Sequence, residues 1–232
     1  MSPPTIIIEH RFNGPEGSAN GGYTCGRLAQ FIEGPARVRL RVPPTLDVAF
    51  EVRRGDSGVS MVRDGELIAE AWPGKPELEV PEPPTIREAA AASLAYIGFK
   101  SHRYTTWFVC GPEQAKGGLR IFAGPVEGRE MVASLWQPDA SLASDGIHVN
   151  PVFIWSALDC PGGFAFPEPE QGGILLGEFS VELFRSATIG ESYVVIGWEF
   201  HREGRKHHTG TSLFSASGDC VGVGQGIWFE VP

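Results

Sequence analysis

The residues whose types suit chemistry lie at the ends of two predicted helices. Asn20 is followed by Gly21 and Gly22, and Asp159 follows the apolar residues Trp155 and Leu158. Backbone N–H groups at a helix start favour negative charge, and glycine lets a ligand approach them closely. Apolar neighbours partly desolvate a carboxyl group and raise its pKa, which suits a general base or a nucleophile near neutral pH. These residue types therefore suit attack on a carbonyl group.

Each of these residues also has a purely structural interpretation. Asn20 is a good helix cap, and capping alone would explain it. Gly21 and Gly22 would allow a tight entry into the helix. Asp159 could be solvated or bonded to a nearby loop, as aspartates near helix ends usually are.

Other catalytic and metal-binding motifs do not occur in the sequence. It contains no G-x-S-x-G, Walker or H-E-x-x-H motif. The glycine-rich stretch at 222–226 leads into IWFEV, which favours a twisted final strand over a dinucleotide-binding loop. The adjacent His207 and His208 would point to opposite faces of a strand, so we expect no metal site. Cys110 has no His beside it in sequence, which favours packing over nucleophilic catalysis.

Composition narrows the class of protein. The 232 residues correspond to one large domain or two small ones, and 30 Gly with 19 Pro predict many turns and exclude a helical bundle. The formal charge of −9 argues against general nucleic-acid binding. The longest near-apolar run, at 89–99, is too short to cross a membrane, and we find no secretory pattern at the start. Four cysteines without a C-x-x-C pair predict reduced thiols in the cytoplasm.

Long stretches in both halves of the chain alternate apolar and polar residues with period two, which predicts strands. At a constant offset of 143 residues, 38–52 aligns with 181–195 without a gap. Glycine turns at 64–65 and 217–218 then predict a tight hairpin in each copy. The pattern predicts an internal duplication, and the alternative is a chance similarity between ordinary α+β elements.

A helix precedes the strands of each predicted copy. Asn20 would cap a helix that ends at Gly34, and Asn150 would cap one that begins at Pro151 and stops or kinks at Pro161.

Between the copies, a Pro-rich acidic linker at 73–84 leads to a capping box, Thr85 with Glu88, and a short Ala-rich helix. We place the boundary near residue 98. Residues 1–98 would form an N-terminal half with the linker and short helix, and residues 99–232 a C-terminal half.

Short motifs resemble one known family. WFVCGPEQAKGGLRIFAGP at 107–125 is similar to the Cys-Phe-x-Cys-Gly stretch leading to Gly-Leu in phenylacetate-pathway-type acyl-CoA thioesterases, with Trp107 in place of the first Cys. In that family His-Gly-Gly begins the central helix, and an acidic residue follows nine positions after the His. Counting nine from Asn150 reaches Asp159, whereas nine from Asn20 reaches Ala29.

The chain therefore resembles the hotdog-fold acyl-CoA thioesterase superfamily. The resemblance implies an α+β double hotdog, with two copies of a central helix wrapped by a twisted antiparallel sheet. In hotdog thioesterases the acid and the donor helix meet across the dimer interface. A fused pseudo-dimer would then retain one composite site, in which Gly21 and Gly22 donate to the oxyanion, Asp159 is the base or nucleophile, and Asn20 orients the water or the carbonyl.

We also expect Asn150 and Trp155 to contribute to substrate binding. Arg205 and Lys206, in the basic run 201–210, would meet the phosphates of coenzyme A, although a solvated hairpin is the simpler interpretation of that run.

The expected activity is hydrolysis of an acyl-CoA to a free acid and coenzyme A. No cofactor is expected, because coenzyme A is part of the substrate, and no nucleic-acid or membrane partner is expected. The chain could associate into a homo-oligomer. Two alternatives remain: an acyl-thioester binding module without hydrolysis, or a hotdog hydratase or dehydratase that uses His148.

Overall fold

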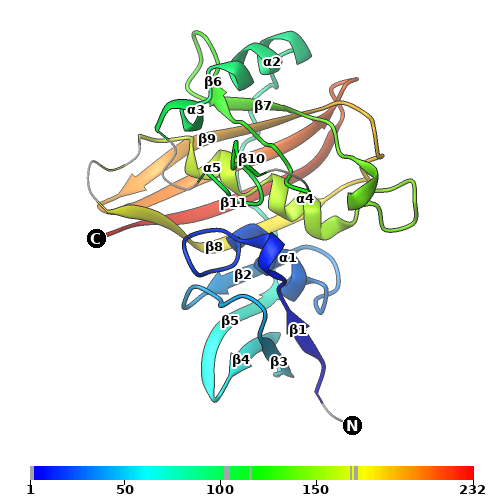
Figure 1. Cartoon of the computed structure of the whole chain (residues 1–232), viewed down its shortest axis with the longest axis vertical. Coiled ribbons are helices and arrows are strands. Elements are labelled where there is room, and N and C mark those ends of the chain that lie inside the picture. The colour runs from blue at the N-terminus through cyan, green and yellow to red at the C-terminus, as the bar shows by residue number, and fades with distance from the viewer. Residues whose placement is uncertain (1–2, 102–104, 115–116, 168, 170–171) are drawn as a thin grey trace.

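The computed structural model describes residues 3–101, 105–114, 117–167, 169 and 172–232. Its described part is built on one antiparallel sheet of eleven strands, ordered β1-β3-β4-β5-β2-β8-β11-β10-β9-β7-β6 (Figure 1). The expected α+β class, with a large antiparallel sheet and few helices, is confirmed. The strands are β1 (Thr5–Ile7), β2 (Ala36–Leu40), β3 (Ala49–Arg54), β4 (Val59–Arg63), β5 (Glu66–Pro73), β6 (Gly124–Pro125), β7 (Val132–Trp136), β8 (Gly173–Leu183), β9 (Tyr193–Glu203), β10 (Lys206–Ser215) and β11 (Cys220–Val231).

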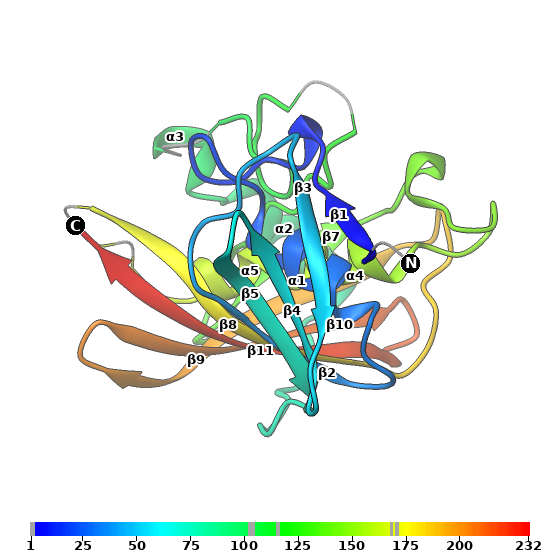
Figure 2. The same ribbon diagram turned by 90° about the horizontal axis from the view of Figure 1, so that it is seen from below.

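The strand order reads as two matching sets that meet at β2 and β8 (Figures 1 and 2). From this junction outward the first set runs β2, β5, β4, β3, β1 and the second runs β8, β11, β10, β9, β7. Arg37 pairs with Ser180, and these two residues are separated by the 143-residue offset of the predicted repeat. A local two-fold axis through this pair would relate the two sets, which is the arrangement that a duplicated unit predicts.

Two longer helices and a short one lie near the junction: α1 (Gly21–Ala29), α4 (Pro151–Ala157) and α5 (Cys160–Gly163). Both predicted caps are present, since the side chains of Asn20 and Asn150 accept from backbone N–H groups of α1 and α4. Two predicted ends are wrong. The first helix ends at Ala29 rather than Gly34, and Pro161 lies in the first turn of α5, where its missing N–H is tolerated, instead of ending the second helix.

Two glycines of α1 allow it to pack closely against α4. A Cβ added at Gly22 would lie 2.5 Å from Asp159 Cβ and 2.8 Å from the Trp155 carbonyl oxygen. A Cβ added at Gly26 would lie 2.8 Å from Trp155 Cβ. Separations below 3.0 Å are essentially never seen for real Cβ atoms, so the two helices could not approach this closely with larger residues there.

The remaining helices lie outside this helix pair. They are α2 (Ile86–Leu94), α3 (Gly98–Ser101) and two 3₁₀ turns at His10–Phe12 and Ala140–Leu142. The predicted capping box of Thr85 and Glu88 begins α2. Helix α2 packs on β7, and its Ala89 and Ala92 join a small core cluster that includes Val194 and Ile196. The boundary near residue 98 stays a prediction. Within the described residues, no helix is long and apolar enough to span a bilayer.

The helix contact leads to a test on stability. We expect Gly26→Ala to lower the free energy of unfolding by about 1–3 kcal/mol, because its new methyl group would overlap Trp155. Gly21→Ala is the matched control in the same helix, since its Cβ would first meet the mobile Leu176 Cδ2, at 3.1 Å. Urea unfolding of both variants measures the difference. Equal stability of the two variants would contradict this packing.

Candidate functional site

Asp159 lies in the short link between α4 and α5 and contacts the start of α1. Its carboxylate Oδ2 accepts hydrogen bonds from Asn20 Nδ2 at 2.7 Å and from the Gly22 N–H at 2.9 Å. The side chain is 3% exposed. The close helix packing makes this contact possible, because Gly22 leaves room for the Asp159 side chain. The structure thus brings together Asn20, Gly22 and Asp159, which are far apart in sequence.

Asn20 serves two purposes with the two ends of its amide. Its Oδ1 accepts from the Tyr23 N–H at 2.8 Å and caps α1, while its Nδ2 donates to Asp159. The capping bond fixes the amide, so the donor end is aimed at the carboxylate. One side chain therefore provides both the helix cap and the hydrogen bond to Asp159.

Burial controls the ionisation of Asp159. Removal from water raises the pKa of this carboxyl to about 7, and the hydrogen bonds from Gly22 and Asn20 partly oppose that rise. The second oxygen, Oδ1, is buried and has no hydrogen-bond partner in the part of the chain that the structure describes. A carboxyl group that changes charge near neutral pH and keeps one free oxygen is suited to take up and return a proton.

The N–H groups of Gly21 and Gly22 differ in what they contact. The Gly22 N–H donates to Asp159 and therefore does not face a ligand. The Gly21 N–H donates to no group among the described residues, and Gly21 lines the same cavity as Asp159. From the sequence we expected both N–H groups to donate to the oxyanion, but in the structure they have different surroundings.

The cavity beside Asp159 has a volume of about 590 Å³. It lies where β2 and β8 cease to pair, since Arg39 with Glu178 is the last pair before the two strands separate. The cavity wall is mostly apolar near Asp159, with Leu40, Val42, Trp107, Cys160, Leu176 and Trp228 among the lining residues. An apolar cavity with a few convergent polar groups is typical of a small-molecule site.

Cationic side chains also line this cavity. Lys206 is among them and the exposed Arg205 is not, while the predicted contact of both residues with phosphates stays a prediction. Arg39 and Arg41 line the cavity instead and form ion pairs with Glu178 and Glu70. Sequence reasoning missed both arginines, although their period-two spacing in RVRLR places them on one face of a strand.

A second cavity, of about 300 Å³, lies at the corresponding place in the other half. Pro151 and Ala29 line it, and they are the counterparts of Gly21 and Asp159 in the two helices. Trp155 lines this second cavity, while Asn150 caps α4 through the Val152 N–H at 3.1 Å and lines neither cavity. Asn150 and Trp155 therefore do not line the Asp159 cavity, and their part in substrate binding stays a prediction.

The other candidates are distant from Asp159 or structural. His148 is about half exposed and pairs with Asp145 outside the cavity, which removes the observation behind a hydratase. His207 is buried and His208 lines the cavity, as expected for opposite strand faces. No group of described residues could hold a metal ion. Cys25, Cys110 and Cys160 are buried and form no disulfide among the described residues, and burial raises the pKa of Cys25 and Cys160 well above the usual range.

The raised pKa of Asp159 predicts a pH-dependent stability. Between the ordinary pKa near 4 and the folded value of about 7, the folded state binds more protons, so stability falls as pH rises through this window. The Asp159→Asn variant lacks the titrating carboxyl group and therefore lacks this loss of stability. We expect the stability of the variant relative to wild type to increase by about 2 kcal/mol between pH 5 and pH 8. Chemical unfolding at both pH values measures this, and parallel pH profiles would contradict the buried carboxyl.

Comparison by sequence finds no relative, since no protein-family profile and no curated protein matches the chain. Comparison by structure finds several. The tesB protein of Mycobacterium avium subspecies paratuberculosis has a TM-score of 0.62 at 15% identity, with 98% of this chain and 92% of that one covered. A candidate thioesterase of Novosphingobium aromaticivorans has a TM-score of 0.63 at 13% identity, with 98% and 95% covered.

A third similar structure is a hotdog-fold protein of unknown function from Alicyclobacillus acidocaldarius. It has a TM-score of 0.51 at 10% identity, with 98% of this chain and 92% of that one covered. The structural resemblance to hotdog thioesterases that the sequence predicted is confirmed. At these identities the likeness establishes architecture, and the chain has the hotdog fold.

Proposed function

We propose that the chain is a double-hotdog thioesterase that hydrolyses an acyl-CoA to a free acid and coenzyme A. One observation carries the proposal: a buried carboxyl group from the second half is held by the helix start of the first half, beside a cavity that Asp159 and Gly21, the first residue of that helix, both line. The thioesterase names of two structures that share the fold support the same reaction class. The chemistry below follows from the residues themselves.

The thioester carbonyl oxygen would accept from the Gly21 N–H. This group lies at the positive end of α1, where negative charge on a tetrahedral intermediate is favoured. The Gly22 N–H instead orients Asp159, so we revise the oxyanion role expected for Gly22 to a positioning role. The absence of a side chain at Gly21 lets the carbonyl approach closely.

Asp159 would act as the general base. Oδ2 is held by Asn20 and Gly22, which leaves Oδ1 to accept a proton from an attacking water. The water oxygen bonds to the carbonyl carbon, the C–S bond then breaks, and the proton on Asp159 passes to the departing thiolate. Direct attack by Oδ1 to form an anhydride is the covalent alternative.

The departing coenzyme A would extend toward the cationic side chains that line the cavity. Lys206 and Arg39 are the candidates for its phosphates, because a chain of net charge −9 must meet an anionic group locally. Arg39 Nη2 lies 2.7 Å from Glu178 Oε2, so phosphate binding by Arg39 would compete with this ion pair. No cofactor enters the proposed reaction.

The second cavity would be inactive. Pro151 has no N–H to donate, and Ala29 provides no carboxyl group. The two halves would therefore contribute one active site between them, with the donor helix from one half and the acid from the other. This division accounts for the incomplete motif in each half.

The Gly21 N–H can be removed in a way that the fold already tolerates. Pro151 occupies the corresponding first position of α4, so Gly21→Pro fits the helix start. We expect Gly21→Pro to lower kcat for acyl-CoA hydrolysis by about 10²–10³-fold, through loss of one oxyanion donor. Gly21→Ala keeps the N–H and should retain far more activity. Thiol release measures the activity of both variants. Equal activity of Gly21→Pro and Gly21→Ala would contradict the donor role of the Gly21 N–H.

The base is tested by the pH dependence of hydrolysis. Because the carboxylate form is required, kcat/KM should rise with pH and level off above about 7. Asp159→Asn should remove most of the activity at every pH. Thiol release from a panel of acyl-CoAs measures both. Acyl-CoA binding that raises Tm without any turnover would instead support a non-hydrolytic binding module.

A further inference from the structure

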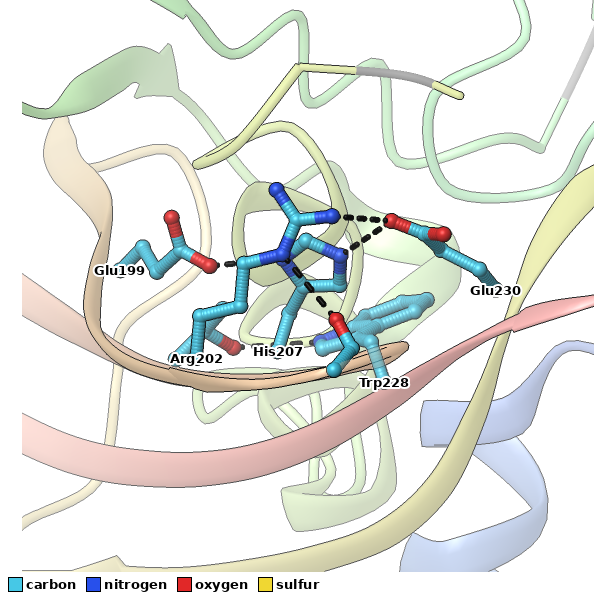
Figure 3. Close-up of polar contacts among 7 residues, drawn as sticks. Glu199, Arg202, His207, Trp228 and Glu230 are labelled. Carbon is cyan, nitrogen blue, oxygen red and sulfur yellow. Dashed lines mark hydrogen bonds and ion pairs between the residues drawn. The ribbon is translucent and has the colours of Figure 1, made fainter. Parts of the chain in front are cut away.

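Charged side chains surround the buried His207 on the strands behind the turn that carries Asp159. His207 is 1% exposed and lies between two carboxylates, with Nδ1 at 2.6 Å from Glu199 Oε1 and Nε2 at 2.9 Å from Glu230 Oε1 (Figure 3). An ionised carboxylate only accepts hydrogen bonds, so a ring nitrogen that contacts one acts as the donor. Arg202 donates to the same Glu230 oxygen at 2.9 Å.

The charged groups around His207 come from β9, from β11 and from the turn before β10. Glu199 and Arg202 come from β9 and Glu230 from β11, while Arg205, in the hairpin turn, acts on Glu230 at longer range. The hydrogen bond from His207 lowers the pKa of Glu230, consistent with a charged partner.

His207 also contacts the segment that follows Asp159. The Phe166 ring stacks on the imidazole with centroids 3.8 Å apart and planes 8° from parallel. Phe166 is buried and lies three residues beyond the end of α5, whose start adjoins Asp159. The ring stack therefore fixes one end of the turn, and the contact with Asn20 and Gly22 fixes the other.

A second contact holds the same turn against the sheet, at the residue that pairs with His207. Trp228 pairs with His207 between β10 and β11, and its Nε1 donates to Thr209 Oγ1 at 3.1 Å. Cβ atoms added at Gly162 and Gly163 of α5 would lie 3.0 Å and 3.1 Å from the Trp228 ring. The turn thus lies flat on Trp228, which also lines the Asp159 cavity.

We propose that His207 is a positioning residue that, through Phe166, holds α5 against the sheet and keeps Asp159 buried in the cavity. The inference rests on the proposed function for its catalytic meaning, but its structural content does not. Without the stack, α5 can separate from Trp228 and admit water to Asp159, and the carboxyl would then lose the burial that raises its pKa.

The test uses the pH-dependent stability due to Asp159, which needs no enzymatic activity. In the wild-type background, Asp159→Asn should raise Tm more at pH 8 than at pH 5. In a His207→Gln background this pH-dependent gain should shrink to less than half. Because each comparison keeps residue 207 constant, the titration of His207 itself cancels. His201→Gln, an exposed histidine on β9, is the matched control and should leave the gain unchanged.

Phe166→Leu provides an independent variant that keeps the charged cluster and removes only the ring stack. It should reduce the gain as His207→Gln does, and it replaces that variant if His207→Gln does not fold. An undiminished gain in a folded variant would overturn the proposal. With activity present, the same variants should move the rise of kcat/KM to lower pH. Absence of hydrolysis in wild type would refute the proposed function but leave the Tm result valid.

Discussion

The structure depends on the burial of one carboxyl group between two helices. Asp159 can reach the start of α1 only because Gly22 carries no side chain, and its charge is tolerated only because Asn20 and Gly22 both donate to it. An unpaired buried carboxylate would be far more costly. Desolvation still outweighs these two bonds, so the group changes charge near neutral pH. A cost in stability and a suitability for proton transfer have the same physical cause.

This arrangement makes the two halves unequal. The strand order repeats about the pairing of Arg37 with Ser180, yet one cavity holds Asp159 and the other has Ala29 at the corresponding position. Asp159 lines only the first of these cavities. Helix α4, the counterpart of α1, begins with Pro151, which has no N–H to donate. The larger cavity is also the one lined by Arg39, Arg41 and Lys206. Both helix ends and the surrounding charges thus favour the same site.

Much of this was predictable from local sequence. Period-two alternation, glycine turns and the asparagine caps located most strands and both central helices, because these signals depend on neighbouring residues. The expectation that the start of the first helix and Asp159 share one site followed from a family pattern rather than from spacing. The helix ends after Ala29 and around Pro161 were missed, as were Arg39 and Arg41 in the cavity wall. Strand pairing across the two halves decides those last positions, and no local pattern encodes it.

The His207 cluster shows the same limit. Sequence reasoning placed His207 and His208 on opposite faces, which the structure bears out, but the partners Glu199 and Glu230 come from neighbouring strands whose register was not predicted. Trp155 was expected beside the substrate, as an apolar neighbour of Asp159. It instead packs against Gly26 and lines the second cavity, since close helix packing sets its direction.

The most direct test of this account is the titration of the Asp159 carboxyl itself. Infrared difference spectra between wild type and Asp159→Asn, recorded from pH 4 to pH 9, isolate the protonated C=O band of this one group. The account predicts that the band disappears with a midpoint of about 7. A midpoint near the ordinary value of 4 would show that Asp159 is solvated and would contradict the buried base on which the proposed function depends.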